Sequence, residues 1–303
     1  MRRAAIVGIV AGAVVVVAAG AGVAWWLLRG ETADQAAQRY VQALEEGDRA
    51  ALEKLLPDDA DHAQALDLFD GAAGRISDAQ LSASGDDDSF RADVMIDGQP
   101  GVVHFSLAQD SGPWLLAADY LGTLEVTTTI GGVTPGAAVE IGGVTVPVGQ
   151  TQVFPAVYTV HAAPADILAG EATVAVTNEA PVTVMLEASL TPEATALAQE
   201  QVDAYAGACA QPATAVPPHC GLRVPWGADL TALSSLDFRI EKTPQVALAA
   251  DATTFAATGG AIVATARGTA RSGGDGTFTY RADDWALYGD VSFEDDQMVL
   301  AVR

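Results

Sequence analysis

The chain has 303 residues, a formal net charge of −24 and a hydrophobic content of 50%. Three of its 15 basic residues lie within the first thirty positions, so residues 31–303 hold 12 basic against 39 acidic residues, a formal charge of −27. A surface of this charge repels polyanions and anionic lipid, which argues against nucleic-acid binding. The length of residues 31–303 is enough for two or three domains.

The first element in chain order is an uncharged apolar run from Ala4 to Leu28. As a helix it would be about 37 Å long, enough to cross a hydrocarbon core of about 30 Å with some tilt. Trp25 and Trp26, at its far end, suit the interface between hydrocarbon and headgroups. We therefore predict a single transmembrane helix within residues 1–30, which acts as an uncleaved signal anchor.

The alternative is a cleaved signal peptide, because Ala19-Gly20-Ala21 has the small-x-small form of a cleavage site. The apolar core of a signal peptide is typically about 7–15 residues, whereas this run continues well past that site. Arg2 and Arg3 precede the run and predict a cytoplasmic N-terminus. The expected location is the cell membrane, with residues 31–303 extracellular.

An α+β domain is predicted at residues 31–120. Residues 32–56 read as two amphipathic helices with Thr32 as a cap and a break at Gly47, and residues 61–70 as a third helix. The chain then alternates between apolar and polar residues with turn residues between the runs, which predicts a four-strand antiparallel meander. Its expected strands are 76–84, 89–98, 101–109 and 113–120.

This helical opening, followed by strands that end in Gly112-Pro113-Trp114-Leu115-Leu116, resembles the nuclear-transport-factor-two-like or cystatin-like domains found outside many bacterial membranes. The resemblance implies a cone that encloses a pocket, used for catalysis in some families and for binding or packing in others. His62, Asp97 and His104 are candidates to line this pocket. The simpler interpretation is that His104 is an ordinary strand residue and that His62 is a solvated residue at the start of a helix. The spacing yields no nucleophile and base together, so we predict that the protein is not an enzyme.

Residues 121–190 predict a small all-β sandwich, because short strands rich in valine and threonine alternate with glycine, proline and asparagine turns. The run from Pro135 to Gly143 and the strand near Tyr158 resemble the PEGA-type modules of bacterial surface proteins. Ile141-Gly142 stands where such modules usually have Asp-Gly, and Ala156 replaces their second glycine. The resemblance implies a spacer or a carbohydrate-proximal adhesion unit, of which the spacer is the simpler reading.

Residues 191–303 predict a second α+β domain. Thr191 and Pro192 start a helix at 192–209, and a long meander follows. The predicted strands are 236–242, 245–250, 253–258, 261–270, 276–294 and 297–303. In both α+β domains a helix precedes a curled sheet, and a tryptophan, Trp114 or Trp285, lies late in that sheet. This similar order indicates a degenerate duplication.

Cys209 and Cys220 are the only two cysteines, and their C-x10-C spacing in an exported region predicts a disulfide. The competing readings are a redox pair or half of a metal site with His219. Redox motifs usually have much closer spacing, and a structural zinc site needs four ligands. Asp58-Asp59 and Asp86-Asp87-Asp88 lack the spacing of a calcium loop and read as solvated turns. No metal and no cofactor is predicted.

The order of membrane helix, α+β domain, β module and second α+β domain resembles the extracytoplasmic part of the teicoplanin-resistance-associated membrane protein family. That family usually carries a zinc ribbon before its membrane helix, and only three residues stand there in this chain. The membrane anchor, the β spacer and the lack of a nucleophile–base constellation together predict a non-enzymatic envelope protein that binds a cell-wall component, a glycopeptide-like ligand or an envelope protein. The alternatives are a scaffold or assembly factor of an envelope complex, and a pocket enzyme in the first domain.

Overall fold

The computed structural model describes residues 31–58, 62–83, 88–134, 138–294 and 297–303. The predicted membrane segment, with Ala4, Trp25, Trp26 and Leu28, lies outside these residues. Within them, no helix is both long and apolar enough to cross a membrane. The described residues form four α-helices, a short 3-10 helix and seventeen strands, which confirms the α+β class.

The chain forms two compact units, and each unit is built from two separate segments of the sequence. The first contains the described residues up to His62 together with Ile76–Tyr120, and the second contains Ala63–Arg75 and Leu121–Arg303. Residues 63–75, which are predicted as part of the first α+β domain, therefore belong to the second unit. The reason is packing, because the helix in this segment lies on the β module.

The first unit joins two helices to a four-stranded antiparallel meander, which agrees with the prediction except that the third predicted helix belongs to the second unit. Thr32 caps the first helix in a capping box with Gln35, and Gly47 ends that helix in the left-handed conformation that glycine readily adopts. Asp48 then caps the second helix. The elements are α2 (Ala33–Glu46), α3 (Arg49–Glu53), β1 (Ser77–Ala83), β2 (Ser89–Ile96), β3 (Gln99–Ala108) and β4 (Leu115–Ala118).

The β module of the second unit consists of two four-stranded sheets. One sheet has the order β10-β12-β5-β8, in which β5 and β12 are parallel, and the other has the order β11-β9-β6-β7. The strands are β5 (Gly122–Ile130), β6 (Ala138–Ile141), β7 (Val144–Pro147), β8 (Gly149–Val153), β9 (Ala156–Ala162), β10 (Leu168–Ala169), β11 (Glu171–Val176) and β12 (Val182–Leu190). Gly142 and Gly143 both have positive φ and form the β6–β7 turn.

Helix α4 (Ala63–Asp70) packs against this module. The Phe69 ring meets Phe154 edge-on at 5.6 Å between centroids, and the Arg75 guanidinium lies over Phe69 at 4.3 Å. Arg75 also donates to the carbonyls of Asp70 and Ala72 at the end of the helix. These contacts explain why α4 leaves the first unit. Of the PEGA-type motif, Pro135-Gly136-Ala137 lie outside the described residues.

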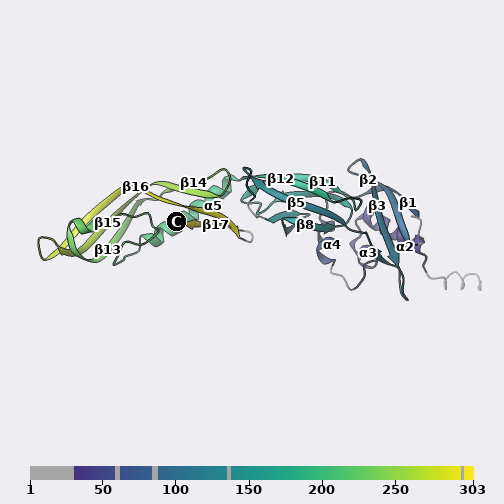
Figure 1. Cartoon of the computed structure of the whole chain (residues 1–303), viewed down its shortest axis with the longest axis horizontal. Coiled ribbons are helices and arrows are strands. Elements are labelled where there is room, and N and C mark those ends of the chain that lie inside the picture. Colours follow the sequence, from purple (N-terminus) through teal and green to yellow (C-terminus); the bar gives the residue numbers. More distant parts are fainter. Residues whose placement is uncertain (1–30, 59–61, 84–87, 135–137, 295–296) are drawn as a thin grey trace, which may run out of the picture. The chain divides into compact units, whose positions relative to one another are not determined.

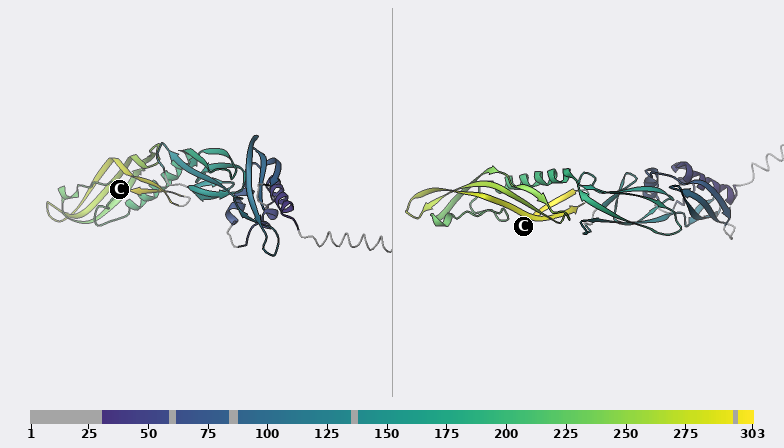
Figure 2. Two further views of the ribbon diagram at one scale, coloured as in Figure 1. Left: turned by 45° about the vertical axis from the view of Figure 1, so that its right-hand side comes forward. Right: turned by 90° about the horizontal axis from the view of Figure 1, so that it is seen from above.

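The last part of the second unit consists of helix α5 and a curved antiparallel sheet, which Figure 1 shows with β13, β15 and β16 as long strands. In the right-hand view of Figure 2, α5 lies along one face of this sheet. The elements are α5 (Pro192–Cys209), the 3-10 helix η1 (Trp226–Ala228), β13 (Leu230–Lys242), β14 (Gln245–Leu248), β15 (Thr254–Ala270), β16 (Asp275–Glu294) and β17 (Gln297–Val302). The predicted strands 253–258 and 261–270 are one strand, because Gly259 and Gly260 form an irregularity in the ladder and not a turn.

Two glutamines of α5 hold the edges of this sheet, β14 and β17. Each side-chain amide accepts one backbone N–H and donates to the carbonyl two residues earlier, as a neighbouring strand would. Gln199 bonds to the Pro244 carbonyl (3.0 Å) and the Val246 N–H (2.9 Å), and Gln201 to the Met298 carbonyl (2.7 Å) and the Leu300 N–H (3.0 Å). We call these contacts the glutamine clamps.

Candidate functional site

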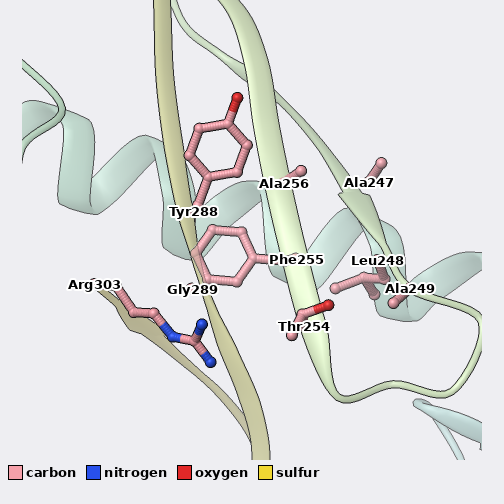
Figure 3. Close-up of a pocket in the computed structure, with 9 residues that line it drawn as sticks. All are labelled: Ala247, Leu248, Ala249, Thr254, Phe255, Ala256, Tyr288, Gly289 and Arg303. Carbon is pink, nitrogen blue, oxygen red and sulfur yellow. The ribbon is translucent and has the colours of Figure 1, made fainter.

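A groove of about 450 Å³ lies on the last sheet. Its volume is within the range of about 300–1,000 Å³ that is usual for small-ligand sites. Residues of three neighbouring strands and Arg303 line it, and Figure 3 shows the rings of Tyr288 and Phe255 with Arg303 to one side and Leu248 to the other. The remaining lining residues are Ala247, Ala249, Thr254, Ala256 and Gly289.

Small side chains form the floor of the groove, and one large aromatic side chain stands beside it. Ala247 pairs with Ala256, which pairs with Tyr288, so the three side chains share one face of the sheet. Tyr288 is 57% exposed. Among the described residues, its hydroxyl has no hydrogen-bond partner. The face therefore presents an open aromatic side chain next to a row of methyl groups.

The rim carries an ion pair. Arg303 donates to Asp290 through Nε at 2.7 Å and also through a second nitrogen, so the contact is bidentate. The hydrogen bond and the charge of Asp290 raise the pKa of Arg303 above its ordinary value. Both side chains are substantially exposed, and such pairs contribute little to stability. Their opposite side-chain charges cancel, and the pair supplies donors and acceptors at the rim of the groove.

Gly289 and Phe255 show why the sheet is compact beneath the groove. The two residues are cross-strand neighbours, and Phe255 is only 3% exposed. A Cβ at position 289 would come within 2.6 Å of the Phe255 ring and would also collide with the Ala301 carbonyl. Glycine at 289 therefore lets the ring cover the backbone and brings β17 close to β16.

Cys209 is the last residue of α5, and it forms the predicted disulfide with Cys220. The buried Trp285 indole donates to the Cys220 carbonyl at 2.8 Å, and the Tyr205 hydroxyl donates to the His219 carbonyl at 3.1 Å. His219 is exposed and has a positive φ of 58°. With both sulfurs joined, the loop is a covalent link between α5 and the segment that contacts β16.

The structure does not gather the pocket candidates of the first unit. Asp97 lies with Gly98 in the two-residue turn between β2 and β3, and both have positive φ. His104 alternates along β3 with buried neighbours and so faces the other side of the sheet. His62 contacts Tyr120 instead, with 3.2 Å between its Nε2 and the tyrosine hydroxyl.

Aromatic side chains fill the space between α2 and the sheet in the first unit. The Tyr40 ring meets Phe105 edge-on at 4.6 Å, and Phe105 stacks on Phe90 at 5.4 Å between centroids. The Tyr40 hydroxyl donates to the Tyr120 carbonyl at 2.9 Å. This position, where the resembling folds enclose a pocket, is therefore a packed core.

No group of three or more histidine, cysteine, aspartate or glutamate side chains in the described part of the chain is arranged to hold a metal ion. Asp59, Asp86 and Asp87, three of the acidic turn residues noted in the sequence, lie outside that part.

The groove at Tyr288 is absent from the sequence expectations. The groove depends on the pairing of Ala256 on β15 with Tyr288 on β16, and the register between two strands cannot be read from the sequence of either strand alone. The available signal is Tyr288 itself. It directly follows Leu287, which alternates with Trp285 on the buried face, so a large aromatic residue falls on the opposite face of the strand. Comparison of the chain with protein-family models, with curated proteins and with solved structures finds no match, so the resemblances given above rest on their sequence motifs alone.

Proposed function

We propose that this is a non-enzymatic, membrane-anchored envelope protein that binds a cell-wall component, a glycopeptide-like ligand or an envelope protein. Residues 4–28 form its anchor, and residues 31–303 lie outside the membrane. The observation that carries the binding role is the groove beside Tyr288, where a large side chain is exposed instead of packed. Exposed aromatic residues next to arginine are typical of binding surfaces.

Two features support a location outside the cytoplasm. The disulfide between Cys209 and Cys220 is of the kind that persists in oxidising compartments. The apolar run at 4–28 with arginines before it has the form of a signal anchor. Neither feature depends on which ligand is bound.

A scaffold role is the second candidate, and Met185 on β12 is the observation that favours it. This side chain is 80% exposed on the outer face of the β module, and methionine is enriched at protein–protein interfaces. A pocket enzyme is the least supported alternative, because the rings of Tyr40, Phe90 and Phe105 occupy the interior of the first unit.

The binding role is tested with the full chain in detergent, mixed with isolated wall fragments or glycopeptides. A ligand that binds only the folded state raises the midpoint of thermal unfolding, and above Kd the rise grows with the logarithm of the ligand concentration. We expect a rise of this concentration dependence with at least one wall fragment. No rise at any concentration would contradict wall binding and redirect the search to protein partners, starting with crosslinking in intact membranes.

The anchor is tested separately by alkaline extraction of membranes. The full chain should stay in the pellet, whereas a chain starting at residue 31 behind a cleavable export signal should be released. Release of both would contradict the proposed anchor and leave the binding result unaffected.

A further inference from the structure

We infer that the groove between Tyr288, Ala256 and the Arg303–Asp290 pair is a binding site for a neutral glycan. This inference rests on the proposed binding function and names the chemical class of its ligand. The site would take one ring of an uncharged saccharide chain, stacked on the tyrosine and hydrogen-bonded to the ion pair.

The aromatic wall is the first reason. One face of a sugar ring is a set of C–H groups, which pack favourably against the electron-rich face of an aromatic ring. Tyr288 offers such a face because it is 57% exposed and its cross-strand neighbours on the side of β15 and β14 are small, Ala256 and Ala247. A larger side chain at either position would occupy the space beside the ring.

The ion pair at the rim is the second reason. Arg303 has five N–H donors and Asp290 about four lone-pair sites, and their bidentate contact uses only part of these. The remaining donors and acceptors suit hydroxyl groups, which both donate and accept. Because the two charges already neutralise each other, the pair does not call for a charged ligand.

Charge and shape exclude the other obvious occupants. A polyanionic glycan would be repelled by residues 31–303, whose formal charge is −27. An apolar peptide would find a floor of single methyl groups at Ala247, Ala249 and Ala256, without pockets for large side chains. The groove is open to solvent, so a ring within a longer chain can enter it.

The experiment measures binding of an uncharged tetrasaccharide of β-1,4-linked N-acetylglucosamine to the full chain in detergent, by calorimetry. Tyr288→Ala removes the stacking face and should weaken binding about tenfold or more. Tyr288→Phe keeps the ring and should stay within about threefold of the unchanged chain. Ala256→Phe fills the floor of the groove and should weaken binding at least as much. Leu197→Ala, the control, shortens an exposed apolar side chain of α5 that does not line the groove and should leave affinity unchanged.

A sulfated tetrasaccharide of similar length and the wall fragments that test the binding role complete the design. The inference would be overturned if Tyr288→Ala and Ala256→Phe bound the neutral tetrasaccharide as tightly as the unchanged chain while their unfolding midpoints stayed the same. Tighter binding of the sulfated probe, or binding of wall fragments without any binding of the neutral tetrasaccharide, would also overturn it. In these three cases the proposed binding function can stand, whereas absence of binding to every wall fragment contradicts that function itself.

Discussion

At position 128 a hydroxyl group lies in the core of the β module without a hydrogen bond. Thr128 on β5 is fully buried, and its Oγ1 has no partner among the described residues. An unsatisfied buried polar group costs about 1–3 kcal/mol. Valine has nearly the same shape and removes the hydroxyl.

We therefore expect Thr128→Val to raise the free energy of unfolding by about 1 kcal/mol. Chemical denaturation measures it. The neighbouring Thr127 is exposed on the other face of the strand, so Thr127→Val should change stability by less than about 0.5 kcal/mol. A loss of stability in Thr128→Val would indicate that the hydroxyl has a partner after all.

Tyr280 on β16 makes folding sensitive to high pH. Its hydroxyl donates to Asp229 at 2.7 Å, and loss of hydration together with this carboxylate raises the pKa of Tyr280 to about 12, from 10.0. The protonated phenol is thus favoured in the folded state. Its contribution to stability is complete below about pH 10 and is lost as pH rises toward 12.

Stability should accordingly fall between about pH 10 and 12, and less steeply in Tyr280→Phe. Denaturation at several pH values compares the two proteins. Burial also raises the pKa of Tyr158, so part of the decline should remain in the variant. Parallel curves for both proteins would show that the Asp229 contact does not titrate as described.

Among the elements, the glutamine clamps join α5 to both edges of its sheet. Gln201→Ala leaves the Leu300 N–H without its acceptor, so this amide should exchange with solvent deuterium faster. The Val246 N–H, held by Gln199, should keep its protection. Gln199→Ala should give the reverse pattern, and Glu200→Gln, between the two, should change neither. Uniform loss of protection in either variant would contradict two separate clamps.

Helix positions were the easiest elements to predict. Thr191 and Pro192 mark the first turn of α5, and the predicted 192–209 agrees with the observed bounds. Strand ends were harder, because a glycine pair can mark a turn or a bulge: Gly142-Gly143 turns the chain, whereas Gly259-Gly260 leaves β15 continuous. The groove at Tyr288 depends on register between strands, and the docking of α4 depends on Phe69 meeting Phe154. Neither contact has a local sequence signal.

For the whole molecule, the two compact units predict separate steps of unfolding. The disulfide lies in the second unit only, and closing its short loop is worth about 2.8 kcal/mol in the chain-entropy account. Calorimetry with reductant should lower one transition by about 6–11 °C and leave the other in place. Cys209→Ala together with Cys220→Ala should reproduce the effect. A single transition that moves as a whole would show that the units unfold together.

The assignment of α4 to the second unit also has a consequence for synthesis. A chain is made from its N-terminus, and early domains generally fold first. Here Leu66, Leu68 and Phe69 emerge before β8 and Phe154 exist, although these form the surface on which α4 packs. The apolar face of α4 must therefore wait uncovered while the strands of the first unit are still being added. The nascent protein carries a surface that a chaperone can hold until the β module is complete.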